Sequence, residues 1–191
     1  WSFGCASRGG RSPDPRAVLL PGALTVHRSL AKRIRNGGFR LSFDTAFAEV
    51  VAGCAAPRPA RDGGLSGTWI TPAMQRAYLA LHEAGYAHSV EVWHGDELAG
   101  GLYGVSLGGL FFGESMFSRA RDASKIALYV LARQVERWSF ELIDCQVMNP
   151  HLGRLGVREM RRARFLEYVR RNDPTRTRRG RWLLDADLAG T

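Results

Sequence analysis

Residues 88–114 read HSVEVWHGDELAGGLYGVSLGGLFFGE, and they decide the fold class. Two strand-like runs, His88 to Trp93 and Leu98 to Leu107, flank a short polar turn, which is a hairpin signal. Two consecutive glycines at 108–109 mark a second tight turn into the run from Leu110 to Glu114. This spacing predicts a three-stranded antiparallel meander.

Helices are expected before and after this meander in the sequence. Asp44 is the predicted N-cap of an amphipathic helix, and Thr71 followed by Pro72 is typical of a helix start. Helices are predicted over 25–35, 44–55, 71–83, 123–138 and 161–171, and a further strand over 142–147. The order of elements predicts an α+β domain around a mixed sheet flanked by helices.

Length and composition limit the alternatives. At 191 residues, we expect a small N-terminal domain over 1–38, which is incomplete, and a main domain over 39–191 with a basic C-terminal tail. No apolar run approaches the roughly 18 residues of a membrane helix, which excludes a spanning protein, and no signal-peptide pattern is present. The three cysteines are odd in number and widely spaced, so we predict a cytoplasmic protein without a disulfide framework or metal.

Charge indicates the kind of partner. The chain carries 27 basic and 18 acidic residues, a net charge of +9, which favours a polyanion. Ten arginines fall between Arg158 and Arg181, and the segment from Asp173 to Gly180 is predicted to be mobile. A second cluster of eight basic residues falls within the first forty positions, and four of them stand on the predicted helix over 25–35, namely Arg28, Lys32, Arg33 and Arg35. The two clusters indicate a phosphate-binding surface; the alternative is an ordinary solvated face. Trp1, Trp69 and Trp182 are candidate stacking surfaces for bases.

Two polar positions stand in apolar surroundings. Glu114 lies among phenylalanines, so it is either functional or exposed and paired with Arg119 or Arg121. On a strand over 142–147, Asp144 and Gln146 face the same side, where they either form a site or mark an edge strand with one wet face.

Other patterns narrow the chemistry. Leu128, Leu131 and Val135 form a stripe at helical spacing, which is either core or the wall of a side-chain pocket. No serine stands in a GxSxG elbow, and the GKS/T loop of nucleotide hydrolases is absent. The sequence therefore shows no nucleophile for covalent acyl transfer.

Six ordered motifs resemble one family, leucyl/phenylalanyl-tRNA–protein transferase, over residues 12 to 172. The motifs are SPDPR at 12–16, GTWIT at 67–71, GGLYGV at 100–105, GESMFS at 113–118, ASK at 123–125 and IDCQ at 143–146. The sequence departs from the family at Gly10 and Arg11, where aromatic residues are usual, and also at Leu102, Leu131 and Val135.

The resemblance implies a GNAT-like fold and a monomeric enzyme without a cofactor. It implies transfer of Leu or Phe, with Met as a further candidate donor, from aminoacyl-tRNA to the α-amine of proteins that begin with Arg or Lys, which creates a degradation signal. Asp144 and Gln146 would be the catalytic pair, and Glu114 would help to hold the acceptor. The implied substrate-binding residues are Trp69, Tyr78, Leu102, Phe111, Leu128, Leu131, Val135, Ile143 and Asn149, and the implied tRNA-binding residues are Arg28, Lys32, Arg33 and Arg35.

The chemistry that this implies needs positioning rather than a strong base. An aminoacyl ester is already activated, and an α-amine with a pKa of about 7.7–8.0 is partly neutral at pH 7. We expect the Gln146 carbonyl to accept a hydrogen bond from the amine, while Asp144 orients the amide. The alternatives are a CoA-dependent N-acetyltransferase, although 118–123 lacks a glycine-rich pyrophosphate loop, and a non-catalytic RNA-binding module.

Overall fold

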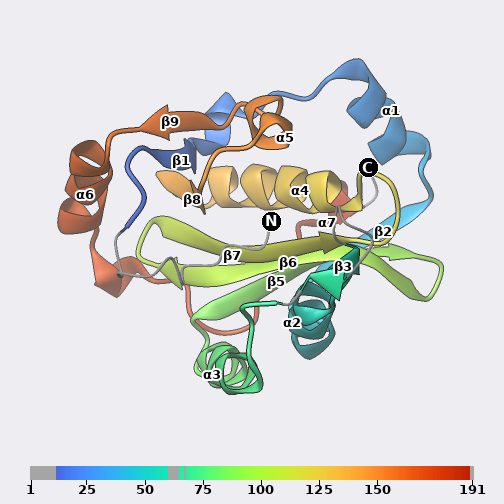
Figure 1. The fold of residues 1–191 in the computed structure, drawn as a ribbon. Helices are drawn as coiled ribbons and strands as arrows, with labels where there is room; N and C mark the ends of the chain where they lie inside the picture. Colours follow the sequence, from blue (N-terminus) through green and yellow to red (C-terminus); the bar gives the residue numbers. More distant parts are fainter. Residues whose placement is uncertain (1–11, 60–64, 67, 190–191) are drawn as a thin grey trace.

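A seven-stranded mixed sheet forms the centre of the protein (Figure 1). The computed structural model describes residues 12–59, 65–66 and 68–189. The strand order is β2-β5-β6-β7-β8-β1-β9, and β3 and β4 pair separately. The strands are β1 (Arg16–Leu19), β2 (Phe39–Phe43), β3 (Arg58–Pro59), β4 (Leu65–Ser66), β5 (Ala87–His94), β6 (Glu97–Leu107), β7 (Leu110–Ser118), β8 (Leu142–Gln146) and β9 (Arg158–Met160).

The predicted meander is confirmed, because β5, β6 and β7 pair antiparallel in sequence order. The strand β8 is internal, since it pairs parallel with β7 and antiparallel with β1. This rules out the edge-strand alternative for Asp144 and Gln146. The strand β1 belongs to residues 1–38 and is nevertheless part of the main sheet; the domain division at residue 38 stays a prediction.

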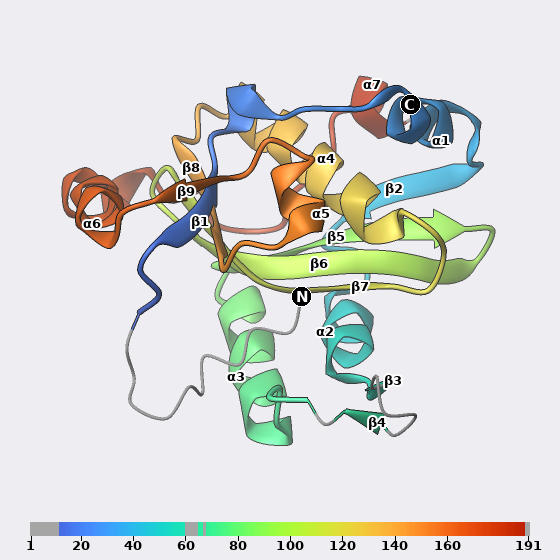
Figure 2. The same cartoon turned by 45° about the horizontal axis from the view of Figure 1, so that its top comes forward.

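Helices cover both faces of the sheet, which confirms the predicted α+β class. In Figures 1 and 2, α4 lies on one face, and α2 and α3 lie on the other. The helices are α1 (Arg28–Asn36), α2 (Phe47–Ala55), α3 (Pro72–Glu83), α4 (Ala123–Arg137), α5 (Pro150–Gly153), α6 (Arg162–Arg171) and α7 (Ala186–Ala189), with 3₁₀ turns η1 (Pro21–Ala23) and η2 (Pro174–Arg176).

The sequence explains where α3 begins and why α4 can pack closely on the sheet. The Thr71 hydroxyl accepts a hydrogen bond from the Met74 amide, and Pro72 occupies the first turn of α3, as predicted. The start of α4 packs on Gly100 of β6, where an added Cβ would lie 2.6 Å from the Cβ of Ala123. A glycine in β6 therefore allows α4 to approach the sheet closely at its N-terminal end.

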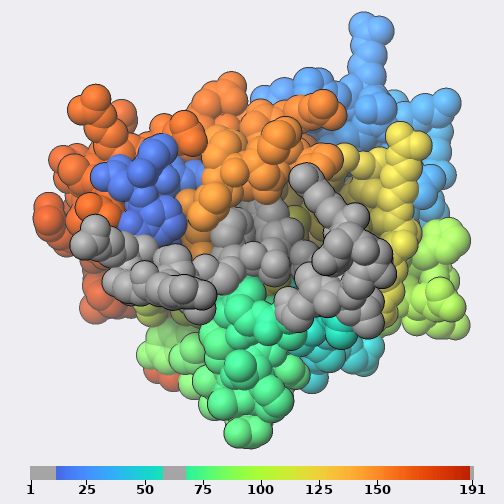
Figure 3. All heavy atoms as spheres, viewed as in Figure 1, coloured from blue at the N-terminus to red at the C-terminus, as the bar shows by residue number. Residues whose placement is uncertain are grey.

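The two basic clusters lie at opposite ends of the sheet. The helix α1 precedes the edge strand β2, whereas α6 follows the opposite edge strand β9. In Figure 3, the blue surface of α1, the orange surface of α5 and the yellow start of α4 share one face of the molecule.

The segment after α6 packs along the protein, so the predicted mobility of Asp173 to Gly180 is wrong. The Thr177 hydroxyl accepts a hydrogen bond from the Gly108 amide, and Arg179 donates to the Ala84 carbonyl. Trp182 is 2% exposed and lies in the core, so it offers no stacking surface, and Trp1 lies outside the described residues. Periodicity could not reveal this, because the contacts join residues far apart in the sequence.

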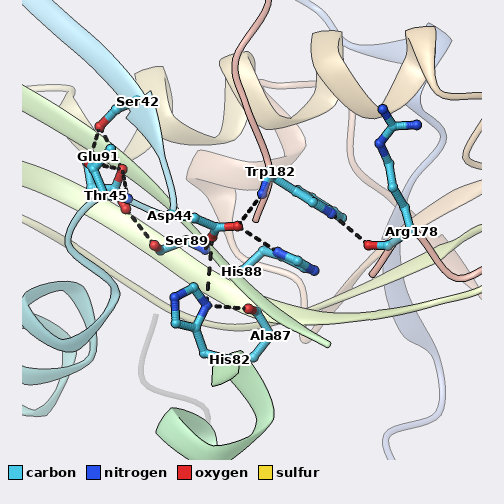
Figure 4. A network of polar contacts seen from close by, with 10 residues as sticks. All are labelled: Ser42, Asp44, Thr45, His82, Ala87, His88, Ser89, Glu91, Arg178 and Trp182. Carbon is cyan, nitrogen blue, oxygen red and sulfur yellow. Dashed lines mark hydrogen bonds and ion pairs between the residues drawn. The ribbon is translucent and has the colours of Figure 1, made fainter. Parts of the chain in front are cut away.

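Asp44 anchors this segment (Figure 4). Its carboxylate accepts hydrogen bonds from the amides of Ser89 and Trp182 and contacts His88 Nδ1 at 2.8 Å, while the Trp182 ring stacks on His88. The prediction of Asp44 as an N-cap is wrong, since α2 begins at Phe47 with Ala46 as its N-cap. A turn at Asp44, whose φ is 53°, instead directs the side chain into the protein.

Candidate functional site

The candidate site lies where β7 and β8 separate. The parallel pairing joins Leu110 to Leu142, Phe111 to Ile143 and Phe112 to Asp144. The next residues along β7 are Gly113 and Glu114, and β8 ends at Gln146. Separation of two strands exposes backbone and side-chain polar groups that a continuous ladder would cover.

Asp144 is fully buried and held by Arg16 of β1. Arg16 Nε donates to Asp144 Oδ1 at 2.9 Å, and Nη2 donates to Oδ2 at 2.6 Å, which makes a two-point ion pair. Burial raises the pKa of Asp144, and the hydrogen bonds and charge of Arg16 oppose that rise. The carboxylate also accepts the backbone amide of Gln146 at 2.9 Å.

Gln146 has a left-handed backbone, with φ at 60°. The Asp144 carboxylate stabilises this turn by binding the amide two residues ahead, a local pattern typical of aspartate. The side-chain nitrogen Nε2 donates to the Gly113 carbonyl at 2.8 Å. Thus Gly113 orients the side-chain amide of Gln146, whereas Asp144 holds its backbone. The expectation that Asp144 orients the side-chain amide directly is therefore wrong.

Glu114 is half-buried and faces this group. The side chains of Tyr78 and Gln146 lie near enough to its carboxylate to lower its pKa as hydrogen-bond donors. Burial raises the pKa of Glu114, the charge of Asp144 adds to the rise, and the two hydrogen bonds oppose it. The alternative pairing with nearby arginines is not seen, because Arg119 donates to the Leu98 carbonyl and Arg121 pairs with Asp122.

The predicted apolar pocket residues are closely packed. All six are at most 3% exposed and belong to one core cluster: Leu102, Phe111, Leu128, Leu131, Val135 and Ile143. The stripe on α4 therefore packs as core in this structure. The pocket itself stays a prediction, and Gly10 and Arg11 lie outside the described residues.

The aromatic residues Trp69 and Tyr78 lie on the α3 side of the sheet. Both pack against the core cluster that contains Tyr103. The rings of Tyr78 and Tyr103 meet edge to face with centroids 4.9 Å apart. Within the described residues, neither the Tyr103 hydroxyl nor Trp69 Nε1 has a hydrogen-bond partner, although both atoms are buried. These groups place aromatic surface beside Glu114.

A cavity of about 790 Å³ is lined by Met116 of β7 and by Asn149, which follow Glu114 and Gln146 along the chain. Among the predicted substrate-binding residues, Leu128 and Asn149 line it. The Asn149 side chain also caps α5 by accepting the amides of His151 and Leu152. The predicted tRNA-binding residues Arg28, Lys32, Arg33 and Arg35 stand together on α1.

Sequence reasoning missed three contributors to this site. Arg16 stands in the SPDPR motif, but its pairing with a residue 128 positions away has no signal in the sequence. The Gly113 carbonyl orients Gln146, and Tyr103 stands beside Tyr78. Across residues 12–59, 65–66 and 68–189, no group of three or more His, Cys, Asp or Glu is arranged to hold a metal, and no helix there is both long and apolar enough to cross a bilayer.

Comparison with known proteins identifies the family. Residues 18–170 match the family model of leucyl/phenylalanyl-tRNA protein transferase. A transferase of that name from Alkalilimnicola ehrlichii is 53% identical over 178 residues, 93% of this chain and 67% of the relative. The relative from Chromohalobacter salexigens is 58% identical over 158 residues, 83% of this chain and 60% of the relative.

The chain spans about two thirds of the length of these relatives. Among solved structures, a GCN5-related N-acetyltransferase from Kribbella flavida matches with a TM-score of 0.43 and 12% identity, over 77% of this chain and 55% of that one. The family match, by contrast, covers most of the chain at high identity. The chain therefore belongs to the leucyl/phenylalanyl-tRNA protein transferase family.

Proposed function

We propose that this protein transfers Leu or Phe, and Met as a further donor, from aminoacyl-tRNA to proteins that begin with Arg or Lys. The observation that carries the proposal is the polar group at the separation of β7 and β8, where Glu114, Asp144 and Gln146 meet beside Tyr78. The family names of its relatives agree with a tRNA donor and a protein acceptor.

The reaction joins an amine to an activated ester. The acceptor nitrogen attacks the carbonyl carbon of the aminoacyl ester, the bond to the ribose oxygen breaks, and that oxygen takes the proton that the amine loses. The products are a peptide bond and a tRNA with a free ribose hydroxyl. No covalent bond to the enzyme is required, so the task of the protein is to position two substrates.

Gln146 is the proposed positioning group for the amine. Its Nε2 donates to the Gly113 carbonyl at 2.8 Å, which sets the orientation of the side-chain amide. Oε1 is thus the atom left to accept a hydrogen bond from the attacking amine. Arg16 and Asp144 hold the backbone of Gln146 and so fix where this oxygen lies.

Glu114 supplies negative charge for a cationic acceptor residue. It is half-buried, and Asp144 adds a second carboxylate that Arg16 largely balances. A lysine or arginine side chain near Glu114 would gain a charge-assisted hydrogen bond. We further propose that the protein acts as a cytoplasmic monomer, with the α1 cluster Arg28, Lys32, Arg33 and Arg35 on the tRNA backbone.

A transfer assay tests the proposal directly. The protein is incubated with leucyl-tRNA and a peptide that begins with Arg, with an Ala-initiated peptide as control and acetyl-CoA in a parallel reaction. We expect leucine transfer to the Arg peptide alone. Acetylation instead of leucine transfer would identify an N-acetyltransferase, and tRNA binding without any transfer would identify an RNA-binding module.

The variant Gln146→Glu tests the positioning role. A carboxylate can accept a hydrogen bond but cannot donate to the Gly113 carbonyl, so it loses its fixed orientation. We expect kcat to fall by about 100-fold, since small misplacements of a positioned group have that effect. Affinity for leucyl-tRNA should be unchanged, and an equal loss of affinity and rate would contradict the role.

A further inference from the structure

The large cavity continues into a second one, and together they form a groove along the start of α4. The second cavity has a volume of about 240 Å³ and reaches His27 and Ser29 at the start of α1. Both cavities are lined by Asp122, Lys125, His151 and Leu155. The groove therefore runs from α1, past the starts of α4 and α5, to the end of β7.

We infer that this groove binds the sugar–phosphate backbone of the single-stranded 3′ end of tRNA. The inference rests on the proposed function and extends its tRNA contacts beyond α1. A second set of cations is thereby assigned to the nucleic acid, namely Arg119, Arg121, Lys125 and Arg154.

Charge is the first argument. Among the lining residues, these four cationic side chains face one carboxylate, that of Asp122. Asp122 pairs with Lys125 at 2.6 Å and with Arg121 at 3.6 Å, which leaves an excess of positive charge. The Arg121 side chain is 88% exposed, so it can turn toward a phosphate at little cost. A polyanion gains from such a surface by releasing its counterions.

The floor of the groove is the second argument. Met116, Phe117, Leu128 and Leu152 line its deeper part, and the Arg119 guanidinium lies 5.2 Å from the centre of the Phe117 ring. An apolar floor beneath a cationic rim suits an unpaired nucleotide, whose base is apolar on its faces and whose phosphate is anionic. A double helix would present only its backbone to such a surface.

The position of the two ends is the third argument. One end reaches Met116, two residues beyond Glu114 on β7, and Asn149, three residues beyond Gln146. The other end reaches α1, where Arg28 and Lys32 stand. A strand that follows the groove from α1 therefore ends at the two segments that carry Glu114 and Gln146, which the aminoacylated end of tRNA must reach.

The test compares two pairs of charge-removing substitutions. The groove variant carries Lys125→Gln with Arg154→Gln, and the control carries Arg164→Gln with Arg170→Gln, two exposed residues of α6. Both variants lose the same charge, and equal melting temperatures would show that both are folded. Affinity for unacylated leucine tRNA is measured across a series of salt concentrations.

In a plot of log affinity against log salt concentration, we expect the slope of the groove variant to be smaller in magnitude by about 1.4. Each lost phosphate contact with a single strand contributes roughly 0.7 to this slope, and the variant loses two. The α6 control should change the slope far less, and Lys125→Arg should bind as the unaltered protein does. Equal slopes for the groove and α6 variants would overturn the inference.

A shortened RNA locates the contact. With leucine tRNA that lacks its single-stranded 3′ end, we expect the groove variant and the unaltered protein to bind equally, whereas Arg28→Gln with Lys32→Gln should still weaken binding. A groove effect that persists on the shortened RNA would overturn the inference. If the groove variant shows these differences in tRNA binding but the unaltered protein does not transfer leucine, the proposed function is overturned while the inference that the groove binds tRNA is supported.

Discussion

Two buried carboxylates, Asp44 and Asp144, lie in different surroundings. Asp44 is enclosed, because two backbone amides and His88 surround it and the Trp182 ring covers His88. Asp144 is equally buried but adjoins the half-exposed Gln146, where two strands separate. Burial and hydrogen bonding alone therefore do not distinguish a structural carboxylate from a functional one. What differs is whether the partner of the carboxylate can reach another molecule.

The largest effect is expected from Asp44→Asn. The amide cannot accept from all three donors, and the Trp182 amide would face an NH₂ group. Each buried donor left unpaired costs about 1–3 kcal/mol, so we expect the free energy of unfolding to fall by about 3 kcal/mol. Denaturant titration measures this. Asp96→Asn, at an exposed hairpin turn, is the matched control and should change little.

Transfer activity completes this test. At a temperature where the Asp44→Asn variant remains folded, we expect its kcat for leucine transfer to equal that of the unaltered protein, because the hydrogen bonds of Asp44 go to His88, Ser89 and Trp182 and to none of the proposed catalytic residues. A selective loss of kcat without a loss of stability would break the comparison.

The matched change Asp144→Asn should act mainly on rate. It removes the charge that binds Arg16 and disturbs the turn that holds Gln146, so we expect kcat to fall by about 100-fold. Stability should fall less than in Asp44→Asn, since the Arg16 side chain is 14% exposed and can be hydrated. Denaturant titration and a transfer assay give both values.

A different outcome for Asp144→Asn would contradict the functional role of Asp144. If Asp144→Asn loses as much stability as Asp44→Asn but keeps its rate per folded molecule, then Asp144 is structural as well. Arg16→Lys offers a check on the same contact, because a single ammonium group cannot reproduce the two-point pairing.

The two regions also differ in how far the sequence predicts them. The meander, the α4 helix and the placement of Asp144 and Gln146 on one strand follow from local patterns, because strand and helix periods act over a few residues. The Asp44 network does not, since Trp182 lies 138 residues away and nothing near Asp44 indicates it. The predicted N-cap at Asp44 failed because a tertiary contact replaced a local one.

The same limit applies within the candidate site. Glu114 is conspicuous in the sequence as a carboxylate among phenylalanines, and the structure brings it together with Gln146 and Tyr78. Arg16 is a required partner of Asp144, yet only the pairing of β1 with β8 shows this. Local sequence identifies residues with unusual surroundings, whereas their partners depend on strand order.

The smallest expected effect is a change in pH dependence from Glu114→Gln. Burial raises the pKa of Glu114 above its ordinary value of 4.5, so the unaltered enzyme should lose affinity for a cationic acceptor as the pH falls through that raised pKa. A second decline in kcat/KM reflects protonation of the acceptor amine, near pH 7.7–8.0. In the pH profile of the variant, the decline caused by protonation of the acceptor amine should remain and the decline caused by protonation of Glu114 should be absent. Its kcat/KM at neutral pH should be lower than that of the unaltered protein.

The pH dependence of the free energy of unfolding provides an independent test of Glu114. When folding raises the pKa of a carboxyl group, the protonated group stabilises the folded state. This stabilisation is present below the pKa of the unfolded chain and is lost as the pH rises through the pKa of the folded protein. At neutral pH, Glu114→Gln should therefore be slightly more stable than the unaltered protein, and the difference should shrink in acid. A variant that is less stable at neutral pH would show that Glu114 serves the fold, as Asp44 does, rather than the acceptor.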